Sequence, residues 1–195
     1  MVNLLDDREL EKQSNFETYK RLEMIIEEKV EFEDGHILVS SLNSIIHNLL
    51  IKRISRNLDK YLNPKGCDSF TESIEIILDK DEKIYRFKPD IFILLKDQLN
   101  IVGQSIKGTP SLIFEVISKS NFNHDTVYKR KYYADCGVLE YCLVYQDGSI
   151  EQLRLEEGMY RVINILKEND IYNSIAFPGV NFKLNDIFLE LEIYR

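Results

Sequence analysis

A glutamate inside an apolar run is the feature that most constrains how this chain can fold. Glu115 interrupts residues 112–117, which read Leu-Ile-Phe-Glu-Val-Ile. A short apolar run of this kind is typical of a strand covered on both faces. A carboxylate buried in such a strand is destabilising unless it meets a partner. Two further apolar runs, at residues 91–95 and 141–145, predict more strands of the same sheet, so the partner of Glu115 is expected nearby.

Asp90 is the first candidate for a group close to Glu115. It precedes the run at 91–95 and follows Pro89, which has no N–H to donate and suits the start of a strand. If the two strands are neighbours, the two carboxylates converge and repel each other unless a divalent cation or a basic side chain lies between them. Hard oxygen ligands of this kind suit Mg²⁺ or Mn²⁺. The alternative is a solvated Glu on a strand face and an Asp that ends a turn.

A charged, tyrosine-rich segment between the second and third runs predicts a helix over residues 122–135. Asp125, Lys129 and Tyr133 recur at i, i+4 and i+8, so they share one helix face. Gly137 suits the position just past the C-terminus of this helix. A lysine on the helix that follows the Glu115 strand can reach back to the carboxylates. The alternative for Lys129 is a solvated position, which is the usual fate of a lysine.

These spaced elements together resemble the Uma-two family of bacterial endonucleases, which has the PD-(D/E)xK restriction-endonuclease-like fold. The resemblance runs from about residue 16 to the C-terminal region. It rests on Pro89-Asp90, Phe114-Glu115-Val116-Ile117-Ser118, Asp125, Lys129, Tyr133-Ala134, Gly137-Val138 and Glu140-Tyr141. In the wider fold a lysine stands two residues after the Glu, where this chain has Ile117. The family similarly has its lysine on the following helix, which matches Lys129.

The resemblance implies a Mg²⁺- or Mn²⁺-dependent endonuclease that hydrolyses DNA phosphodiester bonds. Asp90 and Glu115 would bind the metal together with the main-chain carbonyl of Ile117. Lys129 would hold the attacking water or stabilise developing negative charge. The accessory candidates are Asp125, which can orient Lys129, and two residues that match family positions, Glu31 and His47.

DNA is the partner that this activity implies, and we expect a homodimer because two-fold symmetry matches that of a duplex. Apolar residues near the C-terminus, Ile163, Ile165 and Ile171, are candidates for the dimer contact. A basic strip on a predicted helix is a candidate for contacts with the DNA backbone. It comprises Lys52, Arg53, Arg56 and Lys60.

Length and composition predict one domain over residues 1–195 with an ordinary apolar core, since 44% of the residues are hydrophobic. A net charge of −8 argues against a protein that coats nucleic acid through a large cationic surface, but it does not exclude a nuclease. Three cysteines in no metal-like spacing predict reduced thiols in the cytoplasm. No apolar stretch approaches the roughly 20 residues of a membrane span.

The expected fold class is α/β, a restriction-endonuclease-like mixed central sheet flanked by helices with an added antiparallel C-terminal meander. Helices are predicted over 9–28 and 44–62, the second with Ser41 or Asn43 as its N-cap. Asp34-Gly35 predicts the turn of a hairpin over 30–40. Residues 96–109 are expected to form a mobile loop. The acidic run Glu27, Glu28, Glu31 and Glu33 is expected on a solvated face.

A second function fits the same sequence. The chain can be a non-catalytic binding or regulatory module that keeps the nuclease fold, and the two readings differ in whether Asp90, Glu115 and Lys129 converge. A cysteine hydrolase is disfavoured, because no histidine stands in a recognisable relation to Cys136 or Cys142.

Overall fold

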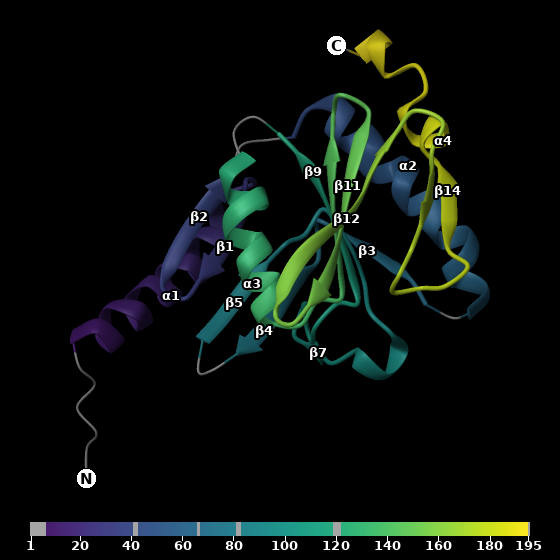
Figure 1. The fold of residues 1–195 in the computed structure, drawn as a ribbon. Helices are drawn as coiled ribbons and strands as arrows, with labels where there is room; N and C mark the ends of the chain where they lie inside the picture. Colours follow the sequence, from purple (N-terminus) through teal and green to yellow (C-terminus); the bar gives the residue numbers. More distant parts are fainter. Residues whose placement is uncertain (1–6, 41–42, 66, 81–82, 119–121, 195) are drawn as a thin grey trace.

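A computed structural model describes residues 7–40, 43–65, 67–80, 83–118 and 122–194. Over these residues the fold is built on two six-stranded sheets and one strand pair (Figure 1). The first sheet is mixed, with β4 and β8 parallel and its other neighbours antiparallel. Its order is β2 (His36–Ser40), β1 (Lys29–Glu33), β5 (Lys83–Phe87), β4 (Glu75–Lys80), β8 (Ser105–Lys107) and β7 (Ile101–Val102).

The second sheet carries the apolar runs that the sequence pattern singles out. Its order is β12 (Met159–Lys167), β11 (Ser149–Glu156), β10 (Glu140–Tyr145), β9 (Leu112–Ile117), β6 (Ile91–Ile93) and β3 (Ser69–Thr71). The strands β9 and β10 are parallel and the other neighbours are antiparallel. A separate pair follows, β13 (Ile171–Asn173) and β14 (Asn181–Lys183). The expected α/β fold with mixed sheets and antiparallel C-terminal strands is confirmed.

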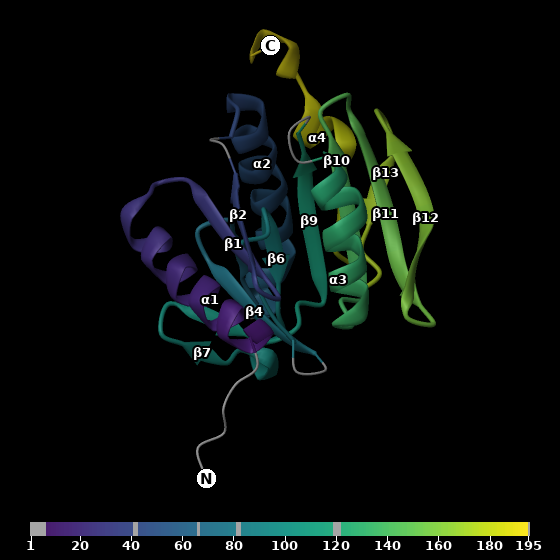
Figure 2. The same cartoon turned by 90° about the vertical axis from the view of Figure 1, so that its left-hand side faces the viewer.

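Helices cover both faces of the second sheet, with α2 (Ile45–Leu62) on one side of β9 and α3 (Arg130–Asp135) on the other (Figure 2). Alternate residues of β9 divide between two apolar clusters, as the period of a strand requires. Phe114 belongs to the same cluster as Leu58 of α2, whereas Ile113 belongs to the same cluster as Tyr133 of α3. Every residue of β9 is buried, so this strand is central as expected.

Two further helices complete these layers. The helix α1 (Asp7–Ile25) packs its Tyr19 against Val30 and Phe32 of β1. The helix α4 (Leu184–Phe188) lies beside α2, where Arg53 donates hydrogen bonds to the carbonyls of Ile187 and Leu189 at 2.9 and 2.7 Å. Single 3₁₀ turns occur at Asn63–Lys65, Lys96–Gln98 and Leu191–Tyr194.

The start of α2 differs from the sequence-based expectation. Ser44 is its N-cap, and the Ser44 hydroxyl accepts a hydrogen bond from the N–H of His47 at 3.2 Å. The expected cap Asn43 instead bonds Glu72 with its side chain at 2.5 Å, and the other expected cap, Ser41, lies outside the described residues. The cap therefore fixes the first turn of α2, which carries His47.

Two further segments depart from simple patterns. Residues 96–109, expected as a loop, include the short strands β7 and β8, which extend the first sheet. The helix expected over residues 122–135 contains a π-helical turn at His124–Lys129 before α3. Such turns are frequent at functional sites. Gly137 follows α3 with φ +85°, the left-handed conformation that the sequence predicted there.

Candidate active site

The candidate site lies where the chain crosses from the first sheet to the second. β5 ends at Phe87 and β6 begins at Ile91, so residues 88–90 form the crossing. The N–H of Lys88 donates to Oε1 of Glu31 at 2.9 Å, and the N–H of Asp90 donates to Oε2 of Glu115 at 3.3 Å. Pro89 has no N–H, so both N–H groups of the crossing bond to carboxylates, one from each sheet.

Asp90 and Glu115 lie side by side, as their strand positions predict. Ile91 of β6 pairs with Phe114 of β9, so one residue further along the same register places Asp90 opposite Glu115. Oδ2 of Asp90 also accepts a hydrogen bond from the N–H of Val116 at 2.7 Å. Both carboxyl groups are buried, so neither can rely on bulk water for its solvation.

Lys129 reaches the carboxylates from the π-helical turn on the far side of β9 from α2. Its Nζ lies 3.0 Å from Oε1 of Glu115 and 3.3 Å from both Oε1 of Glu31 and Oδ1 of Asp125. The hydroxyl of Tyr133 donates to the same Glu115 oxygen at 3.0 Å. The structure thus brings Asp125, Glu31, Glu115 and Lys129 into one contact group, joined to Asp90 through the hydrogen bond to Glu115.

Lys29 is a second lysine of this group, and the sequence interpretation missed it. Its Nζ lies 3.3 Å from Oδ1 of Asp90 and 3.9 Å from Oε1 of Glu31. Lys29, Glu31 and Glu33 alternate along β1, while Val30 and Phe32 face α1. That charged alternation beside an apolar one is the signal that could have identified Lys29.

The expected solvated acidic face is therefore wrong for two of its four members. Glu27 and Glu28 are exposed, but Glu31 and Glu33 are buried because β1 turns them toward the site. Glu33 bonds Nε2 of His124, whose Nδ1 lies 3.6 Å from Oδ1 of Asp125. Burial lowers the pKa of His124, but its bonds with Asp125 and Glu33 raise that pKa to about 9. A charged His124 thus links Glu33 of β1 to Asp125, the carboxylate that contacts Lys129.

The pKa values of Asp90 and Glu115 are shifted in opposite directions. Burial raises the pKa of Glu115 to about 7; Lys129 opposes this and Asp90 adds to it. Burial also disfavours the charged form of Asp90, but Lys29 and His47 hold the pKa of this carboxyl well below its usual range. Asp90 is therefore charged at neutral pH, whereas Glu115 titrates near neutral pH.

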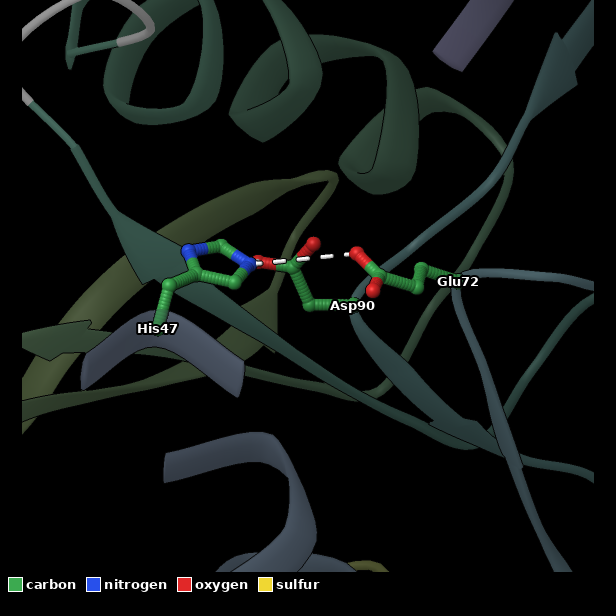
Figure 3. A group of neighbouring side chains, drawn as sticks. All are labelled: His47, Glu72 and Asp90. Atoms are coloured by element: carbon green, nitrogen blue, oxygen red, sulfur yellow. Dashed lines mark ion pairs between the residues drawn. The ribbon is translucent and has the colours of Figure 1, made fainter. Parts of the chain in front are cut away.

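His47 approaches Asp90 from α2, on the side of the cleft. Its Nε2 lies 3.3 Å from Oδ2 of Asp90 and 3.9 Å from Oε2 of Glu72, which the sequence interpretation also missed (Figure 3). His47 is buried, and neither of its ring nitrogens has a hydrogen-bond partner of good geometry. A cleft of about 500 Å³ opens beside this group, and its lining includes Lys29, Glu72 and Lys88.

The charge balance of the group suits a divalent cation. Four buried carboxylates (Glu31, Asp90, Glu115 and Asp125) surround two lysine ammonium groups (Lys29 and Lys129). With all four ionised, His47 neutral and the charge of His124 offset by Glu33, two negative charges are uncompensated. Oxygen ligands with excess negative charge suit both Mg²⁺ and Mn²⁺, so the residues present fit such an ion.

Comparison with known proteins also relates this chain to nucleases. The sequence matches the model of the Uma2 family, described as putative restriction endonucleases, over residues 16–185. The chain belongs to the Uma2 family. The fold is similar to the crystal structure of a putative nuclease belonging to DUF820 from Anabaena variabilis ATCC 29413. That match has a TM-score of 0.67 at 12% identity and covers 82% of this chain and 89% of that chain. No curated protein matches this sequence.

Membership of the Uma2 family agrees with a nuclease. The Ile117 carbonyl accepts a hydrogen bond from Nε2 of Gln146 at 3.2 Å, which leaves its role as a metal ligand a prediction. Arg53 of the predicted basic strip on α2 donates its hydrogen bonds to carbonyls at the end of α4, so it is occupied within the fold. No helix in the described ranges combines the length and the apolar character that crossing a bilayer requires.

Proposed function

We propose that this chain is a metal-dependent endonuclease that hydrolyses DNA phosphodiester bonds, with Mg²⁺ or Mn²⁺ as its cofactor. We also propose that it works as one domain in the cytoplasm. The supporting observation is the convergence of Asp90, Glu115 and Lys129 in a buried, negatively charged group at a junction of two sheets. Perturbed pKa values at such a cluster are typical of catalytic sites.

Each residue has a defined task in this proposal. Asp90 and Glu115 would hold the cation, with the Ile117 carbonyl as a further oxygen ligand. A cation bound there would supply positive charge to offset that of the phosphate and would lower the pKa of a bound water. Lys129 balances Glu115 and presents its ammonium group to the negative charge that develops on the phosphate. Asp125 holds Lys129 in place at 3.3 Å, and Tyr133 fixes the orientation of Glu115 through its hydroxyl.

One observation favours the non-catalytic alternative. Lys29 and Lys129 already contact every carboxylate of the group described above, so part of the charge is compensated by the chain itself. A protein that binds DNA without cutting it can keep such a group for stability alone. This alternative predicts neither metal binding nor cleavage.

A comparison of the wild type with Asp90→Asn tests the proposal. Supercoiled and single-stranded DNA would be incubated with each protein in Mg²⁺, in Mn²⁺ and in EDTA, beside a thermal melt in each buffer. We expect metal-dependent cleavage and a metal-induced rise in melting temperature in the wild type, and loss of both in Asp90→Asn. Asp97→Asn, an exposed carboxylate in the 96–98 turn, is the matched control and should behave as the wild type. Equal inertness of all three proteins with no metal-induced stabilisation would favour the binding module.

A further inference from the structure

His47 is a buried imidazole without a satisfied ring nitrogen. Only 4% of its surface is exposed, and neither Nδ1 nor Nε2 forms a hydrogen bond of acceptable geometry with any described group. Leaving a buried polar atom unpaired is costly, so such atoms call for an explanation. The Nε2 atom points at two carboxylate oxygens, Oδ2 of Asp90 and Oε2 of Glu72 (Figure 3).

The separations in this group fit the coordination sphere of a metal ion. One ligand atom from each of His47, Glu72 and Asp90 lies within 4.8 Å of the others. Nε2 is 3.3 Å from the Asp90 oxygen and 3.9 Å from the Glu72 oxygen. Around an ion with bonds of about 2.1 Å, adjacent ligands are about 3 Å apart and opposite ones about 4.2 Å apart. Both distances fall in this interval.

The group is also open on one side, as an exchangeable ion requires. Glu72 is about a third exposed and lines the cleft of about 500 Å³ together with Lys29, Asn43 and Lys88. The side chain of Asn43 donates to Oε2 of Glu72 at 2.5 Å and so orients it. Water or a phosphate oxygen in the cleft can complete the coordination. The residues come from α2, from the segment after β3 and from the crossing before β6.

We propose that His47, Glu72 and Asp90 form a second divalent-cation position that selects transition-metal ions over Mg²⁺. It shares Asp90 with the Asp90–Glu115 position, and its place in catalysis rests on the proposed function. The imidazole nitrogen is the reason for the selectivity. Mg²⁺ prefers oxygen ligands only, whereas first-row transition ions accept nitrogen readily. Mn²⁺ is therefore expected to bind here more tightly than Mg²⁺.

Calorimetric titration of the full chain with Mn²⁺ and with Mg²⁺ tests this selectivity. The proteins are wild type, His47→Gln, Glu72→Gln and Glu28→Gln, an exposed acid of the same cleft that serves as the charge control. We expect His47→Gln and Glu72→Gln each to weaken the Mn²⁺ binding of this position by about tenfold or more, since loss of a residue that only supports a ligand already costs about that much. In His47→Gln the Mg²⁺ affinity should stay nearly constant, and Glu28→Gln should match the wild type.

Electron spin-echo spectroscopy of wild-type protein loaded with Mn²⁺ gives a second readout that needs no variant. We expect modulation from a coordinated ¹⁴N nucleus. Absence of that modulation, unchanged Mn²⁺ affinity in His47→Gln, or equal losses for Mn²⁺ and Mg²⁺ would each overturn the proposal. DNA cleavage is not among these measurements. A protein that binds Mn²⁺ through His47 but cuts nothing would refute the proposed function alone.

Discussion

Nζ of Lys129 lies 3.0 Å from Oε1 of Glu115, and each residue is only 1% exposed. Both groups are shielded from water, so the charged form of each is stabilised mainly by the other. Lys129 also compensates Glu31 and Asp125, which means that three buried carboxylates share one ammonium group. This dependence makes Lys129 a structural residue as well as a candidate catalytic one, and the two contributions can be separated.

Lys129→Met should destabilise the protein and stop cleavage. Methionine keeps the apolar stem but leaves buried carboxylates uncompensated, so we expect a loss of about 3–5 kcal/mol in the free energy of unfolding. Metal binding should be retained, and saturating Mg²⁺ should restore part of the stability. Urea unfolding with and without Mg²⁺ measures both effects. Lys131→Met, an exposed lysine of α3 paired with Asp135, is the control and should cost less than about 1 kcal/mol.

Glu115→Gln should change how stability depends on pH. The pKa of Glu115 is about 7 in the folded chain against an ordinary value of 4.5, with burial as the main cause. A group that binds its proton more tightly when folded contributes stability below its unfolded pKa and loses it as pH rises through the folded pKa. Glutamine does not titrate, so the variant should gain stability relative to the wild type between pH 5 and pH 8.

Urea unfolding at several pH values in metal-free buffer measures this difference. Glu17→Gln, an exposed position on α1, should stay parallel to the wild type. The Gln variant should also lose metal affinity and cleavage, because an amide replaces an anionic ligand. A stability difference between Glu115→Gln and the wild type that does not vary with pH would show that Glu115 is ionised throughout the range.

Glu140→Gln should destabilise the fold without acting on the candidate site. Glu140 is fully buried in β10, and its carboxylate accepts hydrogen bonds from six donors: the Cys142 thiol, Gln152, Tyr172, Ser174 and the N–H groups of Ile175 and Ala176. An amide presents an NH₂ group to some of these donors, so we expect a loss of at least about 3 kcal/mol. Glu151→Gln on β11 is the half-buried control. Metal binding of the folded fraction, measured by calorimetry, should be unchanged in Glu140→Gln.

We propose that the expected homodimer forms through the edge strand β12. This strand is at the edge of the second sheet in the described residues, and Val162 and Ile165 are 44% and 64% exposed on it. Exposed edges with apolar side chains pair readily with other strands. We expect wild-type protein to be dimeric by light scattering and Ile165→Lys to be monomeric. Thr126→Lys, on the π-helical turn, controls for added charge. A monomeric wild type at working concentration would contradict the proposal.

The neighbouring positions of Asp90 and Glu115 were predictable because they depend on local patterns. Period-2 apolar runs defined β9 and β10, and Pro89 marked the start of the Asp90 strand. The placement of Lys129 followed from helical spacing, even though a π-helical turn carries it. These signals act within a few residues, where backbone geometry alone decides which side chains meet.

Lys29 and Glu72 could not be placed from the sequence, because their contacts are set by the packing of distant elements. Lys29 lies 61 positions before Asp90, and a lysine is usually solvated. Glu72 follows the three-residue strand β3, which has little pattern of its own. The division of the strands into two sheets had the same cause, since pairing partners are not encoded in a strand's own periodicity.

The crossing at residues 88–90 has a consequence for reading related sequences. Because Glu31 and Glu115 bond the only two N–H groups of that crossing, selection for folding alone can preserve them after hydrolysis has been lost. The presence of both glutamates in a related sequence is therefore weak evidence that the related protein is active. His47 and Glu72 accept no backbone hydrogen bond at the crossing, so in a related protein without activity these two positions should be substituted first.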